Sequence, residues 1–457
     1  MKRVLILAYY FPPIAASGSL RPVGFSRHLG EYGYLPHIVS TDLHDVHPPV
    51  AIDQSLTRLI PEVAEVDRLK HINYLKELLA FRETMRSWLP VTHSTSTHSA
   101  SEHSLPKPQI GTDDAAKANE PGPFKRLKSE FLNQIFLFPD HQKPWISAVL
   151  NHVKRLPKEK RPELVYATAN PWSALVAGQK VADCLDIPFV ADFRDPWTRN
   201  PKPAESDRLA KKALKLEREI VGRADRVIAN TEELKMAFVE DYPEFATKFV
   251  SITNGFNDIL LKQDEPEKAA VKKQAATELC HFGSVYELRN PLQLLQSVDQ
   301  LLMAGALVPG DLIIRFIGNW LVESPDCNRL VEELEAKGLV TREPSLSHEN
   351  YLAAMRQADN LLILQQDFPL QIPGKIYEYI SSGRPLVVVG GEGATANLIQ
   401  RHGLGAAFPN RVDDLKVHLI ELVRNGNGFK AVDISQIDNF NYSALTAKLA
   451  DVFDQLV

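Results

Sequence analysis

The chain has 457 residues, of which 44% are hydrophobic and 24% are charged, and its formal net charge is -5. This composition is that of a soluble globular protein with enough apolar residues for more than one core, and it excludes disorder as the main state. The small acidic excess excludes a global basic field for nucleic acid, so any site for a polyanion must be local.

The N-terminal segment and the cysteines bear on the cellular compartment. A short signal peptide is one reading of residues 1–11, but Pro12 and Pro13 end the apolar run too early for a membrane span, and a buried strand fits better. The chain has three widely spaced cysteines and no C-x-x-C, which argues against a disulfide framework or a structural zinc site. They are Cys184, Cys280 and Cys327. We therefore expect a cytoplasmic protein.

Short apolar runs alternate with amphipathic segments along most of the chain, the pattern of βαβ units. In the first half, strands are predicted at 4–8, 36–40, 164–167, 189–191, 226–229 and 249–252. A charged, proline-bearing stretch at 261–268 then separates two domains. In the second half, strands are predicted at 279–282, 312–317, 360–364, 385–389 and 406–408. Helices are predicted near 291–304, 327–337, 348–357, 374–382, 394–401, 412–424 and 442–456.

These elements predict an α/β fold with two Rossmann-like lobes that face a cleft. The expected domains are an N-terminal lobe at 1–260, a C-terminal lobe at 261–430 and a final amphipathic helix within 431–457. Residues 91–123 break the pattern, because they contain nine Ser/Thr, four Pro and no aromatic residue. Such a segment cannot offset an ordering entropy of about 1–2 kcal/mol per residue, so we predict a flexible insertion. His93, His98 and His103 within it are expected to form a polar tract rather than a metal site, since no fixed scaffold holds them.

Two loops after strands in the first half carry candidate site residues. A loop of small residues runs into a helix and offers backbone N–H groups to an anion, so Gly18 and Arg21 are candidates for phosphate binding, with a tight structural turn as the alternative. The chain has neither G-x-G-x-x-G nor a P-loop motif, which removes the main support for nicotinamide or P-loop ATP binding. The second loop follows residue 191, where polar groups are natural in a cleft but a structural Asp–Arg pair is the alternative. Its candidates are Asp192, Arg194, Asp195 and Trp197, with Asn170 from the preceding strand end.

Two segments in the second half suit a diphosphate. Gly283 permits close backbone approach after a strand, and Arg289 comes just before a predicted helix. Farther on, Lys375 and Glu378 are i and i+3 at the start of another helix, so both can face one ligand: Lys375 the phosphates and Glu378 the sugar hydroxyls. A surface ion pair between them is the structural alternative.

Five segments in series resemble GT-B glycosyltransferases of family 4, and within that family the bacterial enzymes of capsule, O-antigen and exopolysaccharide assembly. They are YFPP with Gly18 and Arg21, ADFRDPW at 191–197, TNGF at 253–256, FGS at 282–284 and PGKIYEYISSGRP at 373–385. The resemblance implies a retaining transfer of a sugar from a UDP- or GDP-linked donor, held by the C-terminal lobe. The acceptor, a glycan or a polyprenyl-diphosphate-linked glycan, would lie in the N-terminal lobe, and the last helix would cross back to that lobe.

The resemblance also implies roles for individual residues. Glu378 stands where the family has the glutamate that binds the ribose, whereas the other glutamate of the family's E-x7-E motif is replaced by Leu370. The implied donor-binding residues are Gly283, Ser284, Arg289, Gly374, Lys375 and Glu378. The implied catalytic residues are Asp192, Arg194, Asp195, Arg289 and Lys375. The implied acceptor- or phosphate-binding residues are Gly18, Arg21, Asn170 and Trp197.

The leaving diphosphate requires a metal or fixed cations, and the chain has no D-x-D motif. We therefore expect no metal or other cofactor, with Arg289 and Lys375 in place of Mg²⁺. Three other functions stay open: a glycoside hydrolase with Asp192 and Asp195 as its carboxylates, a nucleotide-sugar 2-epimerase, and a non-catalytic nucleotide-sugar-binding subunit. The basic and aromatic stretch at 124–138 fits either peripheral contact with the inner face of a membrane or a helix packed on the lobe.

Overall fold

The computed structural model describes residues 1–46, 50–72, 138–201, 206–257, 276–366, 368–424 and 437–457. The predicted insertion at 91–123 with its three histidines, almost all of the basic and aromatic stretch, and the linker at 261–268 lie outside the described residues. The predicted domain boundaries near 260 and 430 also lie outside them. Among the described helices, none is both long and apolar enough to cross a bilayer.

The N-terminal lobe contains a seven-stranded parallel sheet in the order β3-β2-β1-β4-β5-β6-β7. Its strands are β1 Lys2–Leu7, β2 Tyr34–Thr41, β3 Glu65–Leu69, β4 Leu164–Ala169, β5 Phe189–Phe193, β6 Arg226–Ala229 and β7 Phe249–Ser251. Its helices are α1 Leu20–His28, α4 Lys143–Lys154, α5 Ser173–Leu185, α6 Asp207–Arg223 and α7 Glu232–Asp241. Every residue of β4 and β5 is buried, because helices cover both faces of a parallel sheet.

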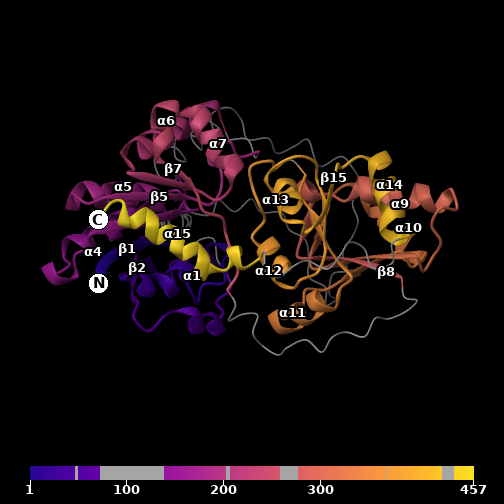
Figure 1. The fold of residues 1–457 in the computed structure, drawn as a ribbon, viewed down its shortest axis with the longest axis horizontal. Coiled ribbons are helices and arrows are strands. Elements are labelled where there is room, and N and C mark those ends of the chain that lie inside the picture. The colour runs from indigo at the N-terminus through magenta and orange to yellow at the C-terminus, as the bar shows by residue number, and fades with distance from the viewer. Residues whose placement is uncertain (47–49, 73–137, 202–205, 258–275, 367, 425–436) are drawn as a thin grey trace, which may run out of the picture.

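The C-terminal lobe repeats this architecture with a six-stranded parallel sheet in the order β12-β10-β8-β13-β14-β15. Its strands are β8 Thr277–Phe282, β10 Leu312–Ile317, β12 Val340–Glu343, β13 Asn360–Leu364, β14 Leu386–Val389 and β15 Gly405–Phe408, with a small separate pair of β9 Val285–Tyr286 and β11 Trp320–Leu321. Its helices are α9 Leu292–Met303, α10 Pro325–Ala336, α11 His348–Gln357, α12 Lys375–Ser381, α13 Ala394–His402 and α14 Val412–Arg424. The two lobes lie side by side, with α12 near the junction (Figure 1).

The last helix, α15 (Tyr442–Asp454), returns from the C-terminal lobe and packs on α1 of the N-terminal lobe (Figure 1). Its apolar face joins the core beneath α1, and Tyr442 meets Phe25 edge to face with ring centroids 5.4 Å apart. Gly24 of α1 makes room for this contact, since a Cβ there would lie 2.4 Å from the Tyr442 ring. The predicted two-lobed fold with a crossing C-terminal helix is therefore confirmed.

Each predicted strand overlaps an observed one, but the outer strands β3 and β12 are not predicted from the sequence. Both lie at a sheet edge, and their sequences, EVDRL and VTRE, carry charged residues with few buried positions. An edge strand is covered less fully than a central one, so the continuous apolar run that signals a buried strand is missing.

Candidate active site

A pocket of about 680 Å³ lies between the two lobes. The N-terminal lobe contributes residues from the loops after β1 and β5, and the C-terminal lobe contributes the turn after β8 and the start of α12. The predicted site residues that line the pocket are Arg21, Arg194, Asp195, Gly283, Arg289, Gly374, Lys375 and Glu378. The chain thus brings the carboxyl ends of strands from both sheets to one cavity, the place where open α/β sheets bind ligands.

The turn after β8 brings bare backbone to the pocket wall. Gly283 has a φ of 113°, a conformation that favours glycine. Gly318, at the end of β10, has a φ of 147°, and a Cβ there would lie 2.5 Å from the Gly283 carbonyl oxygen. Two glycines are therefore needed for β8 and β10 to end side by side at the pocket. Ser284, also predicted to bind the donor, follows this turn but is not among the described residues that line the pocket.

Lys375 is directed at this turn from the first residue of α12. Its Nζ donates to the Phe282 carbonyl oxygen at 2.7 Å, and it lies 3.2 Å from the position of a Cβ on Gly283. Burial and the neighbouring Arg289 lower the pKa of Lys375 to about 7, although Glu378 acts in the opposite direction. A partly desolvated ammonium group of this kind gains strongly from a nearby anion.

His281, which the sequence analysis does not single out, supports Lys375 from beneath. It is fully buried in β8, with Nδ1 3.0 Å from the Leu362 carbonyl oxygen. A carbonyl can only accept, so Nδ1 carries the proton and Nε2 presents a lone pair to Lys375 Nζ at 3.3 Å. Burial and the Lys375 charge hold the pKa of His281 well below its usual range. Because His281 lies within an apolar strand, nothing in the sequence distinguishes it from a histidine of the core.

Arg289 forms a second cationic wall of the pocket. It ends the short 3₁₀ turn Glu287–Arg289, and its guanidinium lies over the rings of Tyr286 and Phe368 at 5.4 and 6.0 Å. Its Nε is buried and has no hydrogen-bond partner among the described residues. A ligand anion in the pocket would supply that partner.

Glu378 faces the same cavity one helical turn after Lys375. Tyr351 donates its hydroxyl to Glu378 Oε2 at 2.7 Å, and burial followed by this carboxylate raises the pKa of Tyr351. Tyr351 also packs edge to face on Phe282, with centroids 5.3 Å apart. Tyr351 therefore fixes the Glu378 carboxylate, and it is a pocket residue that the sequence analysis does not identify.

Arg21 and Asp192 form a buried ion pair rather than two separate ligand contacts. Arg21 Nε and Nη2 donate to the two Asp192 oxygens, each at 2.8 Å. Its other three N–H groups meet oxygens of Ile252, Thr253 and Asn254. All five guanidinium donors are thus used within the protein. Burial alone would lower the pKa of Arg21, but the Asp192 carboxylate raises it.

Asp192 is also fully engaged. Its Oδ2 accepts from the hydroxyls of Tyr166 and Thr168, both at 2.6 Å, in addition to Arg21. It is completely buried at the end of β5 and is not among the described residues that line the pocket. The pair joins α1 and β5 to residues 252–254, which follow β7. Asp192 thus has the contacts of a structural Asp–Arg pair, with Arg21 rather than Arg194 as its partner.

Gly18 and Asn170 both lie against the guanidinium of Arg194. The Arg194 guanidinium donates from Nε to the Ala169 carbonyl and from Nη2 to the Asn170 carbonyl, both at 2.6 Å. Gly18 lies against the same guanidinium, and a Cβ there would come within 2.8 Å of both Nη atoms. The loop that resembles a phosphate-binding turn therefore makes room for Arg194, which itself reaches the pocket.

Asp195 lies at the contact between the lobes. Gln371 Nε2 of the C-terminal lobe donates to Asp195 Oδ1 at 3.0 Å, and both residues line the pocket. Burial raises the pKa of Asp195, with Arg194 acting in the opposite direction. Trp197, two residues on, stacks on Trp172 with centroids 4.8 Å apart and packs against the N-terminal core, outside the described pocket lining.

Leu370, which replaces the expected glutamate, is a packing residue at the interlobe contact. Its side chain packs against the N-terminal core, and its carbonyl oxygen accepts from Thr231 Oγ1 at 2.8 Å. The neighbouring Gln371 is the residue that faces the pocket. The C-terminal lobe therefore offers an amide, one position later, where the resemblance leads us to expect a carboxylate.

Two Rossmann-like lobes that share an interlobe pocket, with a C-terminal helix returning to the first lobe, define the GT-B class of fold. Solved structures agree over the whole chain. Sucrose-phosphate synthase from Thermosynechococcus elongatus has a TM-score of 0.58 at 13% identity, covering 100% of this chain and 99% of its own. HepE from Anabaena, solved in complex with UDP and glucose, has a TM-score of 0.58 at 16% identity, covering 100% of both chains. At these identities the similarity establishes the fold.

A family model matches part of the N-terminal half of the sequence. Residues 112–258 match the model of Glycosyltransferase Family 4. The chain as a whole therefore has the GT-B fold, and this part of its sequence is similar to Glycosyltransferase Family 4. A search of curated protein sequences gave no match. The lipopolysaccharide outer core galactosyltransferase WaaB also shares the fold, with a TM-score of 0.52 at 12% identity and complete coverage of both chains.

Proposed function

We propose that the chain is a retaining glycosyltransferase that transfers a sugar from a UDP- or GDP-linked donor to a glycan or a polyprenyl-diphosphate-linked acceptor. The observation that carries this proposal is the convergence of Lys375, Arg289 and the Gly283 turn on one interlobe pocket. Two cationic side chains and a glycine backbone at one site suit a diphosphate. The structure of HepE with UDP and glucose supports a nucleotide-sugar donor for this fold.

The proposed chemistry uses the cations on the leaving group. Cleavage of the anomeric C–O bond moves negative charge onto the diphosphate, and positioned cations stabilise that charge most effectively where water is excluded. Among the described residues, Lys375 Nζ is bonded to Phe282 O and His281 Nε2, which leaves its third N–H for the ligand. The unpartnered Arg289 Nε offers a second donor, and Glu378 would bind the ribose hydroxyls.

The N-terminal lobe would supply the acceptor side. Arg194 and Asp195 line the pocket from the N-terminal lobe, and we assign them to the transferred sugar and the acceptor. Arg21 and Asp192 would act by positioning this wall, since their polar atoms are engaged within the protein. In this proposal the lobes correspond to residues 1–260 and 261–430, and residues 431–457 brace them.

The pathway we propose is bacterial surface polysaccharide biosynthesis in the cytoplasm, at the inner face of the membrane. The five sequence segments support this assignment, together with the fold shared with WaaB, a lipopolysaccharide outer core galactosyltransferase. A putative UDP-N-acetylglucosamine 2-epimerase from Listeria monocytogenes has the same fold, with a TM-score of 0.50. The fold therefore does not separate the two activities, and the family 4 match favours transfer.

A donor panel tests the proposal. The purified protein is incubated with UDP- and GDP-sugars, first in a thermal-shift assay and then with polyprenyl-diphosphate-linked glycan acceptors. We expect one donor class to raise the melting temperature and a product with the donor's anomeric configuration by NMR. Inversion at C2 of the free donor would instead show an epimerase. Stabilisation without turnover on any acceptor would favour the binding subunit.

A further inference from the structure

A second polar cluster lies in the N-terminal lobe, away from the interlobe pocket. It consists of His37 on β2, Asp67 on β3 and His152 on α4. The described residues that line the pocket include none of these three. The cluster therefore has no place in the donor or acceptor chemistry.

The local fold explains why the three side chains meet. In the parallel pairing of β2 and β3, Val39 is opposite Asp67 and His37 is opposite Glu65. His37 and Asp67 are thus diagonal neighbours on one face of the sheet, since alternate residues of a strand share a face. Helix α4 lies on this face, and His152 is near its C-terminal end.

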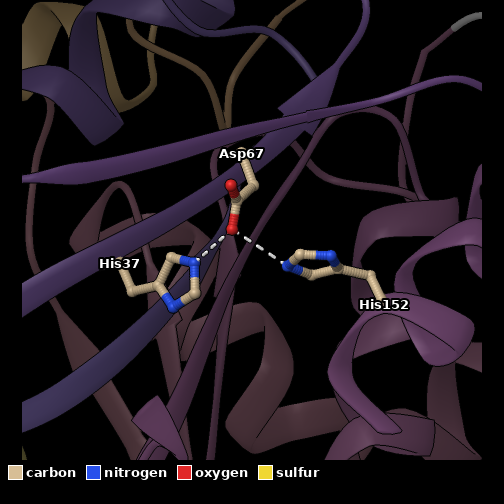
Figure 2. Close-up of side chains that lie close together, drawn as sticks. All are labelled: His37, Asp67 and His152. Atoms are coloured by element: carbon tan, nitrogen blue, oxygen red, sulfur yellow. Dashed lines mark hydrogen bonds and ion pairs between the residues drawn. The ribbon is translucent and has the colours of Figure 1, made fainter. Parts of the chain in front are cut away.

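The ligand-type atoms of the cluster point at a common position. His37 Nε2 lies 2.7 Å and His152 Nε2 lies 3.0 Å from the same oxygen, Asp67 Oδ2, and both rings turn their Nε2 inward (Figure 2). The His37 contact is a hydrogen bond. The His152 contact is not aligned as one, and His152 Nε2 is buried with no hydrogen-bond partner among the described residues. That nitrogen has a lone pair or a proton without an acceptor in line.

In the described part of the chain, no Lys or Arg side chain forms an ion pair with the Asp67 carboxylate. The ion pairs of Asp67 there are those with His37 and His152. The Asp67 side chain is 43% exposed, so an ion can reach it from solvent, whereas His37 is fully buried and fixed in the sheet.

We propose that His37, Asp67 and His152 bind a Zn²⁺ ion. Two imidazole nitrogens and one carboxylate oxygen are a ligand set that zinc accepts, at about 2.0–2.2 Å from the metal, with water in the fourth position. The three atoms lie within 4.8 Å of one another, so a small rotation of the exposed Asp67 opens the cluster to that radius. Binding would replace the misaligned His152 contact by a metal–nitrogen bond.

The role of the ion is structural. It ties the edge strand β3 to α4, two elements that residues 73–137 separate in sequence. Cross-links that close long segments restrict the unfolded chain more than those that close short ones. β3 has no fully buried residue, so it has little core packing of its own. A bound ion would therefore stabilise the edge of the N-terminal sheet.

Zinc binding is tested on the full-length chain, purified without a histidine tag and treated with EDTA. Titration with ZnCl₂ by calorimetry should give one equivalent bound and a higher melting temperature, while MgCl₂ should give neither. Co²⁺ in place of Zn²⁺ should give visible absorption from a site with nitrogen ligands. The variants His152→Gln and Asp67→Asn should lose the equivalent and the thermal shift, with unchanged circular dichroism.

The histidines at 93, 98 and 103 provide the matched control, because they are a second source of imidazole in the same chain. A His93→Gln/His98→Gln/His103→Gln variant should bind zinc as the wild type does. Absence of stoichiometric binding in the wild type would overturn the proposal and leave a hydrogen-bonded His–Asp–His cluster. Loss of binding in the triple variant but not in His152→Gln would also overturn it.

Discussion

Arg21 in the N-terminal lobe and Lys375 in the C-terminal lobe both line the interlobe pocket, but their donors meet different partners. The five N–H groups of Arg21 are bonded to Asp192 and to oxygens of residues 252–254. In the part of the chain that the structure describes, Lys375 has two acceptors for its three protons, and burial with Arg289 nearby lowers its pKa to about 7. A saturated cation holds a fold together, whereas an under-coordinated cation is available for a ligand.

The largest expected effect is the loss of folding stability when Arg21 loses its carboxylate partner. Asp192→Ala leaves the buried Arg21 charge without its carboxylate, which typically costs about 3–5 kcal/mol. Asp183→Ala is the control, because Asp183 pairs with Arg223 at the surface and such pairs contribute about 0–1 kcal/mol. Urea unfolding measures both. Equal losses in the two variants would contradict the structural role of the Arg21–Asp192 pair.

Lys375→Met should lower turnover without lowering stability, in contrast to Asp192→Ala. It removes a cation that faces the leaving group, so turnover should fall by roughly 10²–10³. The melting temperature without donor should not fall, because the variant also removes the cost of a desolvated ammonium. Lys215→Met on α6 is the control, since that side chain is 81% exposed. A Lys375→Met enzyme with near-normal turnover would remove Lys375 from the site.

The pH dependence of UDP or GDP binding also distinguishes Lys375 from Arg21. Only the protonated Lys375 attracts the diphosphate, so affinity should fall as pH rises through about 7, by up to about tenfold per pH unit. Calorimetry between pH 6 and 8.5 measures this, and Lys375→Met corrects for titration of the nucleotide itself. If wild type and Lys375→Met have the same pH profile, Lys375 is not the titrating group.

Without ligand, the stability linked to Lys375 should change with pH in the opposite direction. The unfolded lysine keeps its proton up to its ordinary value of 10.5, whereas the folded one loses it near 7, so the unfolded state binds more protons between these values. The contribution of Lys375 to the free energy of unfolding therefore rises with pH above 7. The difference in unfolding free energy between wild type and Lys375→Met, measured at pH 7 and 9, reports it.

The smallest effect concerns the contact between the lobes. Gln371→Leu removes the hydrogen bond to Asp195, and a single such bond contributes about 0.5–1.5 kcal/mol, or a factor of about 2 to 10 in kcat/KM. Gln300→Leu on α9 is the control, because Gln300 is not among the described residues that line the pocket. Steady-state kinetics compares them. An unchanged kcat/KM in Gln371→Leu would show that this bond does not hold the lobes during turnover.

Much of the fold could be predicted because its signals are local. Central strands such as β13 and β14 are unbroken runs of buried residues, and such runs can be recognised in the sequence without knowing which strands lie beside them. The edge strands β3 and β12 could not be predicted in this way, because exposure on an edge permits the charged residues that mask a strand. The pocket position of Lys375 and Glu378 follows from their spacing on α12, which is also a local property.

The sequence by itself determined the alternation of strands and helices, the two lobes, and the polar segments that meet at the strand ends. Only the tertiary structure decided which of those polar residues keep donors for a ligand. Arg21 and Arg194 look alike in sequence, and both line the pocket. Every donor of Arg21 is bonded to Asp192 or to oxygens of residues 252–254, 231 to 233 positions away in sequence, whereas the described hydrogen bonds of Arg194 use only Nε and Nη2. Hydrogen-bond saturation depends on long-range partners, and a local pattern does not contain them.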